Sequence, residues 1–252
     1  AIAVAFTRGD LWSVRPAASP IEGIALPEGS IAFPVGHKAT LTVALSHQAS
    51  GPSALPALPS MASVVQGWTT VTERSGRHVL PDVTLSERLT AERCEVALRG
   101  APVGDSVAAL IAYGLMARMG EAAADLVPLV AAEVERAAKR ADRDWTLHAA
   151  LDGAATVLAM AGEHRALADL DRVRAKLAPS ATLPAEAPSE SLRLVAWADR
   201  RLVRTVDGSL SLLPDDMPDD WYGLGFEAHR VPTVGADSLS FAVRWHGFRP
   251  AV

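Results

Sequence analysis

The sequence predicts a mixed α+β protein with N-terminal β-strands, a central block of about seven helices in αα-hairpins, and a C-terminal antiparallel β-element. Three observations support this fold class. Short segments rich in β-branched and aromatic residues occupy both ends of the chain. Apolar residues recur at helical spacing in the middle, and Gly or Pro residues separate the segments. We therefore predict three parts, at 1–45, 60–205 and 206–252.

Composition restricts the class of partner. The 252 residues are 49% hydrophobic and 21% charged, which suits a globular protein with a sizeable core. The net charge of −5 argues against nucleic acid or an anionic membrane as partner, because both require a basic face. No apolar run reaches the ~18 residues that cross a bilayer. The single cysteine, Cys94, excludes an intrachain disulfide and favours a cytoplasmic location.

The N-terminal part is predicted to be β-structure. Four short segments read as strands: AIAVAFTRG at 1–9, LWSVRP at 11–16, SIAFPVG at 30–36 and ATLTVALS at 39–46. The following stretch, 46–60, contains three prolines and several small residues, so we expect a linker there.

Helices are predicted from about residue 60 to 205. In the first, Ser60 to Arg74, an apolar stripe follows the helical period: Met61, Val64, Val65, Trp68 and Val71. Thr84 with Glu87 three positions later fits a capping box for the second helix, which ends at Gly100. Asp105 or Ser106 begins the third helix, and a fourth at 121–140 has Pro128 either as a kink or near its start. We expect Asp82 and Asp144 to act as caps or turn residues.

Two helix pairs repeat a local pattern. Residues 113–126 resemble residues 155–170, and in both an Ala- and Met-rich helix ends at a Gly-Glu pair. Gly120-Glu121 and Gly162-Glu163 therefore predict tight turns between antiparallel helices. Stacked αα-hairpins of this kind occur in helical repeats and in α/α toroids. After a second linker at 179–189 and a helix at 191–203, strands return in GSLSLLP, GFEAHRVPT and SLSFAVRW.

Two longer patterns give a resemblance to known enzymes. They are GWTTVTERSGRHVLPDVTLSERLTAERCEVAL at 67–98 and LSLLPDDMPDDWYGLGFEAHRVPTVGADSLSFAVRWHG at 210–247. In this order the chain resembles a shortened six-hairpin (α/α toroid) glycoside hydrolase. Its ending also resembles a family of uncharacterised proteins from high-GC Gram-positive bacteria. The resemblance implies a carbohydrate ligand. A complete toroid has more helices than we expect here, and no general acid or base of the family can be transferred to this chain.

The C-terminal strands supply the candidate site. Residue alternation places Arg244 and His246 on one face of the last long strand and Trp245 on the other. If the two strands pair, their polar faces gather Glu227, His229, Arg244 and His246, with Glu227 the candidate catalytic carboxylate. Trp221 and Trp245 offer flat rings to a sugar. The competing interpretation is cross-strand charge pairing on a solvated face, with Trp245 in the core.

We predict neither a metal nor a cofactor. The carboxylates of PDDMPDDW, Asp215, Asp216, Asp219 and Asp220, could bind Ca²⁺, but Asp beside Pro is ordinary turn chemistry. The seven histidines are scattered, and the sequence contains neither C-x-x-C nor a dinucleotide or phosphate-loop fingerprint.

Two functions follow from these patterns. The first is a glycosidase-like protein that cleaves a carbohydrate, or that binds one after the loss of catalysis. The second is a non-catalytic helical scaffold that binds a protein partner on its helical face. A pocket lined by acids and aromatic rings would favour the first function, and a long apolar groove the second.

Overall fold

A computed structural model of the chain describes residues 2–6, 37–38, 41–45, 59–140, 144–177, 183–206, 209–233, 235–247 and 249–252. The chain divides into two compact units, Ala1–Met61 and Ala62–Val252. In the first unit, β1 (Ile2–Phe6) pairs antiparallel with β2 (Leu41–Leu45), in two of the segments predicted to be strands. The segments predicted to be strands at 11–16 and 30–36, and most of the linker at 46–60, lie outside the described residues.

The described residues contain seven α-helices, as predicted. They are α1 (Met61–Thr72), α2 (Val83–Arg99), α3 (Ser106–Met119), α4 (Ala123–Arg140), α5 (Trp145–Met160), α6 (His164–Arg174) and α7 (Ser191–Leu202). None of these described helices is both long and apolar enough to span a membrane.

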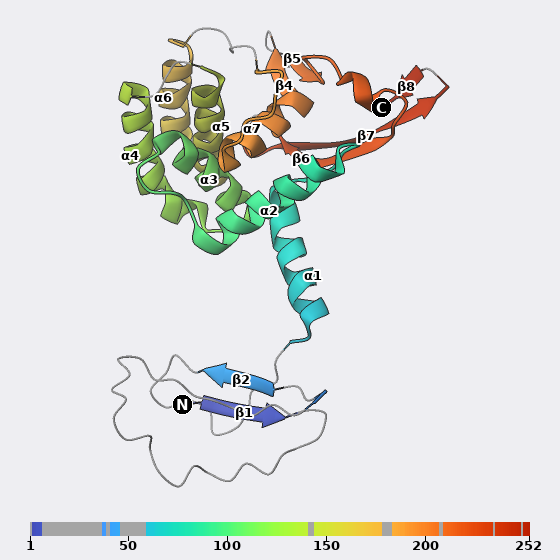
Figure 1. Ribbon diagram of the computed structural model, residues 1–252. Helices are drawn as coiled ribbons and strands as arrows, with labels where there is room; N and C mark the ends of the chain where they lie inside the picture. Colours follow the sequence, from blue (N-terminus) through green and yellow to red (C-terminus); the bar gives the residue numbers. More distant parts are fainter. Residues whose placement is uncertain are drawn as a thin grey trace. The chain divides into compact units, whose positions relative to one another are not determined.

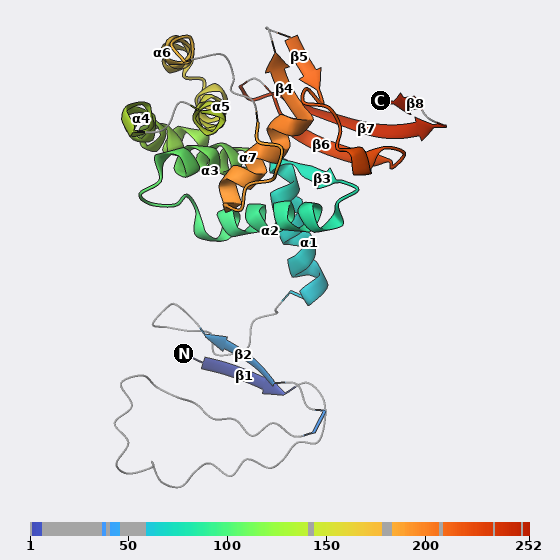
Figure 2. The same cartoon turned by 45° about the horizontal axis from the view of Figure 1, so that its top comes forward.

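The strands of the second unit form two antiparallel sheets. The larger has the order β3-β6-β7-β8, built from β3 (Arg77–Val79), β6 (Phe226–Pro232), β7 (Ser238–His246) and β8 (Arg249–Ala251). The smaller pairs β4 (Val203–Val206) with β5 (Ser209–Leu212). Figures 1 and 2 show α7 lying between the helices α3–α6 on one side and these C-terminal strands on the other. The mixed α+β class is confirmed, and the segments predicted as 60–205 and 206–252 belong to one compact unit apart from the first residues of α1.

The two predicted αα-hairpins are α3–α4 and α5–α6 (Figure 1). Each turn has a glycine with positive φ, 115° at Gly120 and 75° at Gly162. The next N–H in each case bonds back across the end of the helix, from Glu121 to the Met116 carbonyl at 3.0 Å and from Glu163 to the Leu158 carbonyl at 2.9 Å. Because glycine adopts this conformation without strain, it satisfies the last carbonyls of the helix and reverses the chain.

The central helix α3 crosses α5 at a pair of glycines. Ten of the fourteen residues of α3 are buried, so this helix packs on most of its circumference. At the crossing, a Cβ on Gly114 would lie 2.7 Å from Gly153 Cα, and a Cβ on Gly153 would lie 2.3 Å from the Leu110 carbonyl oxygen. Only glycine permits this separation, and the backbones of the two helices therefore touch directly.

A buried ion cluster joins the larger sheet to α2 and α7. Asp199 Oδ1 lies 3.2 Å from Arg93 Nη2 and 3.1 Å from His78 Nε2, and all three residues are buried. Arg93 Nη2 also lies 3.2 Å from His78 Nδ1. Since a guanidinium can only donate, His78 Nδ1 must accept, which places the proton of the neutral ring on Nε2. Nε2 is close to Asp199 but has no aligned hydrogen-bond acceptor among the described residues. Burial, followed by the charge of Arg93, lowers the pKa of His78.

The structure corrects several local predictions. The cap of α2 is Asp82, which was expected to act as a cap or turn residue, and its Oδ1 accepts from the Leu85 N–H at 2.9 Å. The helix therefore begins before the capping box predicted at Thr84 and Glu87, and that prediction is wrong. Asp105 and Asp144 also cap their helices, as expected. Strands β3 and β4 were not predicted, and Pro128 lies inside α4.

Two segments pack differently from their predicted roles. The apolar stripe predicted along the first helix is exposed on α1, with Met61 84% accessible. In contrast, the linker predicted at 179–189 contributes to the core, because Leu183 is buried and the Pro184 carbonyl accepts from the Trp197 indole N–H at 2.9 Å.

Replacing Gly153 by Ala should lower the free energy of unfolding by about 3 kcal/mol or more, because the new methyl group forces α3 and α5 apart. Gly67→Ala in α1 is the matched control, since a Cβ there meets no atom within 4 Å. The control should be neutral or stabilise the protein by up to about 1 kcal/mol through helix propensity. Urea denaturation measures both, and an unchanged midpoint for Gly153→Ala would contradict the described crossing.

Stability should fall as the pH drops below 6.5, the ordinary pKa of histidine, because the folded state binds a proton on His78 less readily than the unfolded state. Above that pH the contribution of His78 is complete. The urea midpoint at pH 7.5 and 5.5 measures this effect. His78→Gln should flatten the dependence, whereas the exposed control His164→Gln should retain it. Equal dependence in all three proteins would show that His78 is not held neutral.

Candidate functional site

The structure brings together three of the predicted site residues on the exposed face of the larger sheet. Arg244 Nη2 donates a hydrogen bond to Glu227 Oε1, and His229 Nε2 lies 3.1 Å from Glu227 Oε2. The hydrogen bond from Arg244, and then that from His229, lowers the pKa of Glu227. Glu227 is therefore an ionised carboxylate with both oxygens engaged, which suits a cross-strand ion pair better than a proton donor.

The two predicted aromatic residues lie on the other side of this sheet. Trp221 is buried against Phe226, with ring centroids 5.2 Å apart. Trp245 is half-buried, and its indole N–H donates to the Leu224 carbonyl at 2.9 Å. The exposed ring beside Trp245 belongs to Tyr222, with centroids 5.7 Å apart. Strand alternation thus separates the candidate carboxylate from the candidate sugar-stacking rings.

The remaining candidates are also accounted for. His246 lies at the sheet edge, opposite Arg249 of β8 and on the same side of β7 as Arg244. Of the four aspartates at 215–220, Asp215 binds Arg204 through a 2.6 Å contact. The described part of the chain contains no group of three or more His, Cys, Asp or Glu side chains placed to hold a metal ion.

A different site lies between the helices and the strands. A cavity of about 290 Å³ opens among α3, α5, α6, α7 and the strands β4–β6. Its charged lining consists of four arginines and two aspartates: Arg118, Arg174, Arg200, Arg204, Asp152 and Asp199. We call it the arginine cavity. Its apolar lining comes mainly from Ile111, Leu115, Val195, Val203 and Leu210, and the touching glycines Gly114 and Gly153 also line it.

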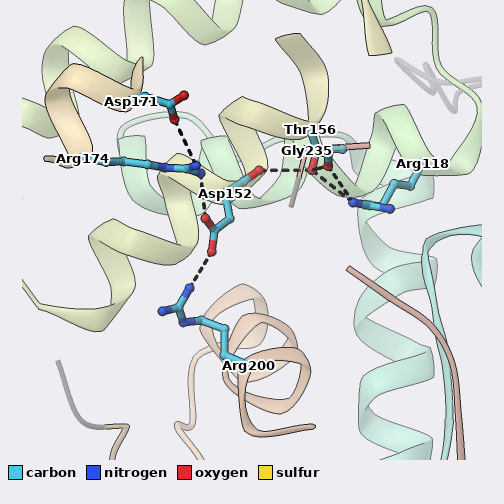
Figure 3. A network of polar contacts seen from close by, with 7 residues as sticks. All are labelled: Arg118, Asp152, Thr156, Asp171, Arg174, Arg200 and Gly235. Atoms are coloured by element: carbon cyan, nitrogen blue, oxygen red, sulfur yellow. Dashed lines mark hydrogen bonds and ion pairs between the residues drawn. The ribbon is translucent and has the colours of Figure 1, made fainter. Parts of the chain in front are cut away.

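Asp152 of α5 lies at the centre of the charged lining (Figure 3). Its Oδ1 accepts from Arg174 Nη2 at 2.7 Å, and its Oδ2 accepts from Arg200 Nη1 at 2.5 Å. Arg174 also contacts Asp171, which is more exposed, at 3.6 Å. Desolvation by burial lowers the pKa of Arg200 although Asp152 opposes this shift. A guanidinium remains charged in proteins, so the arginines of the cavity lining carry positive charge although they are partly desolvated.

Arg118 fastens the turn between β6 and β7 to the helices. From the last turn of α3, its Nη2 contacts the Gly235 carbonyl at 3.0 Å, the Asp237 carbonyl at 3.1 Å and Thr156 Oγ1 at 3.3 Å. Thr156 also donates toward the Gly235 carbonyl at 3.0 Å, as Figure 3 shows. These contacts fix the edge of the cavity that Pro232 and Thr233 line.

Arg204 is the least satisfied of these cations. Its side chain is only 10% exposed, and its Nη2 contacts Asp215 Oδ1 at 2.6 Å. Its Nε and Nη1 are buried and have no hydrogen-bond partner among the described residues. Buried donors without acceptors are costly, and a charged donor is the most costly kind. Because these two nitrogens are buried, they are not exposed to the cavity, and Arg204 contributes its positive charge to the lining.

Sequence reasoning missed this site because its four arginines and Asp152 come from five separate elements. Two signals were nevertheless present. Asp152 interrupts the otherwise apolar helix WTLHAALDGAATVLAM, and Arg200 and Arg204 are spaced four residues apart. Neither signal shows from sequence alone that the residues meet.

Comparisons with known proteins do not identify the chain. No family model, curated protein or solved structure matches it. The resemblance to six-hairpin glycoside hydrolases therefore stays a prediction.

Proposed function

We propose that this chain binds a small organic anion in the arginine cavity. The observation that supports the proposal best is the excess of positive charge in the cavity lining, which has four arginines against two aspartates. An anionic oxygen placed there would accept charge-assisted hydrogen bonds, which are about twice as strong as neutral ones. It would also offset the cost of desolvating these guanidinium groups.

The carbohydrate class expected from the sequence is compatible with this proposal, because sugar acids and sugar phosphates are organic anions. Binding is better supported than hydrolysis. Glycoside hydrolysis uses two carboxylates that exchange protons or attack the sugar. In the cavity, Asp152 is held by Arg174 and Arg200, and Asp199 is held by Arg93. Both carboxylates are committed to arginine partners, so they position cations and do not resemble a free acid–base pair.

A second function, the scaffold that binds a protein partner, is favoured by the exposed apolar stripe of α1. Met61, Val65 and Trp68 are exposed there together with Val64 and Val71. Such patches mark surfaces that bind other proteins. Trp68→Asp should abolish capture of a partner and leave anion binding unchanged. Capture that survives this substitution would contradict a role for the stripe.

Arg204→Gln should weaken the binding of organic anions about tenfold to a hundredfold, because it removes one of the four cations of the cavity lining and interactions with a charged group contribute about 1.5–3 kcal/mol. Calorimetric titration and thermal shift with millimolar citrate, phosphate and glucose 6-phosphate provide the measurement. Arg136→Gln is the matched control, since Arg136 is an exposed arginine paired with Glu133 on α4, outside the cavity.

The control should bind as the unaltered protein does, and added salt should weaken binding in both. If no anion raises the melting temperature of the unaltered protein, the proposal is wrong. Equal affinity of Arg204→Gln and the unaltered protein would place the anion elsewhere.

A further inference from the structure

The arginine cavity has a hydrogen-bonding strip beside its cations. Three residues of α5, His148, Asp152 and Thr156, line the cavity at four-residue spacing. Residues at this spacing lie on one face of a helix, so the strip extends about 12 Å along α5. The wall from α7 and β4 contributes Arg200 and Arg204. A ligand in the cavity therefore meets both charged donors and a row of polar groups that includes a carboxylate.

Asp152 gives this strip its selectivity. Each of its oxygens accepts from one arginine, and 44% of the side chain is exposed. A carboxylate has about four acceptor positions, so about two remain for a ligand. A ligand with hydroxyl groups can donate to them. An anion without donors would instead place its negative charge near this carboxylate, which repels it.

The size and the apolar lining of the cavity limit the ligand further. A volume of about 290 Å³ is at the lower end of the range for ligand pockets, which corresponds to a molecule with about one sugar ring. Leu210, which is 48% exposed, and the half-buried Pro232 present apolar surface to that volume. The C–H groups of a ring can pack on this surface while its hydroxyl groups reach Asp152.

We propose that the ligand is a hydroxylated organic anion of about one sugar ring, a sugar acid or a sugar phosphate, and that Asp152 selects it through its hydroxyl groups. The inference rests on the proposed function, because it assumes that the arginines bind the anionic group. It adds the chemical class of the ligand and a specificity-determining residue.

Three probes of the same ring size test the class of ligand by calorimetric titration. Glucuronate has an acid and hydroxyl groups, cyclohexanecarboxylate has the acid alone, and glucose has the hydroxyl groups alone. Glucuronate should bind the unaltered protein at least tenfold more tightly than either of the others. Glucose 6-phosphate in the same titration distinguishes a phosphate from a carboxylate as the anionic group.

Asp152→Asn tests the residue. Removing the charge should tighten the binding of cyclohexanecarboxylate severalfold or more and reduce the preference for glucuronate to less than threefold. Asp171→Asn is the matched control, because Asp171 also contacts Arg174 but does not line the cavity. It should keep the tenfold preference. If Asp152→Asn does not fold, Asp152→Ser removes the same charge and carries the same expectation.

The outcomes separate the two proposals. If glucuronate, glucose 6-phosphate, cyclohexanecarboxylate, citrate and phosphate all fail to bind, the proposed function itself is wrong. If only citrate or phosphate binds, the proposed function stands and the further inference is overturned. If the two carboxylates bind equally to the unaltered protein, the cavity binds anions but does not select for hydroxyl groups, and the further inference is overturned. The same holds if Asp152→Asn keeps the full preference for glucuronate.

Discussion

The contact between Gly114 and Gly153 is the constraint on which the rest of the second unit depends. Because a methyl group at Gly153 would lie 2.3 Å from the Leu110 carbonyl oxygen, α3 and α5 meet backbone to backbone. This crossing fixes how the two αα-hairpins pack on each other. The Gly turns at Gly120 and Gly162 then place α4 beside α3 and α6 beside α5. It also forms part of the cavity lining. The position of Asp152, one residue before Gly153, is therefore fixed by packing and does not depend on a mobile loop.

Helix α7 carries two neighbouring charged residues, Asp199 and Arg200, that form ion pairs in different directions. Asp199 holds Arg93 and His78 toward α2 and β3, while the adjacent Arg200 reaches Asp152 in the cavity. Buried ion pairs contribute little net stability, because desolvation offsets their attraction, although breaking one is costly. The ion pairs of α7 instead fix the positions of the side chains that they join. Asp199 has neighbours on both sides, because it holds the ion cluster and also lines the cavity. The larger sheet and the arginine cavity are thus connected through a single side chain.

The sequence predicted the features that local chemistry decides. Gly120 and Gly162 identify their turns because a left-handed residue is needed there, and strand alternation placed Glu227 near Arg244. Where two residues offer a helix cap, local sequence does not decide between them. Asp82 and not Thr84 caps α2, because its carboxylate accepts from the Leu85 N–H. The arginine cavity could not be predicted, because its residues extend from Ile111 to Thr233 and meet only through packing. The two neighbouring aromatic residues show the limit of sequence prediction, because Trp221 was predicted to contact a ligand but is buried, whereas Tyr222 is exposed.

The fastening of the β6–β7 turn by Arg118 has a consequence for how the chain can be divided. The sequence pattern placed the end of the helical segment near residue 205, and a shortened protein cut there would contain all seven described helices. That cut would remove the carbonyls of Gly235 and Asp237 that Arg118 contacts, together with Asp215, the partner of Arg204. Arg118 and Arg204 would then lose these partners. The helices and the terminal strands therefore have to be kept together when the protein is expressed or transplanted into another protein.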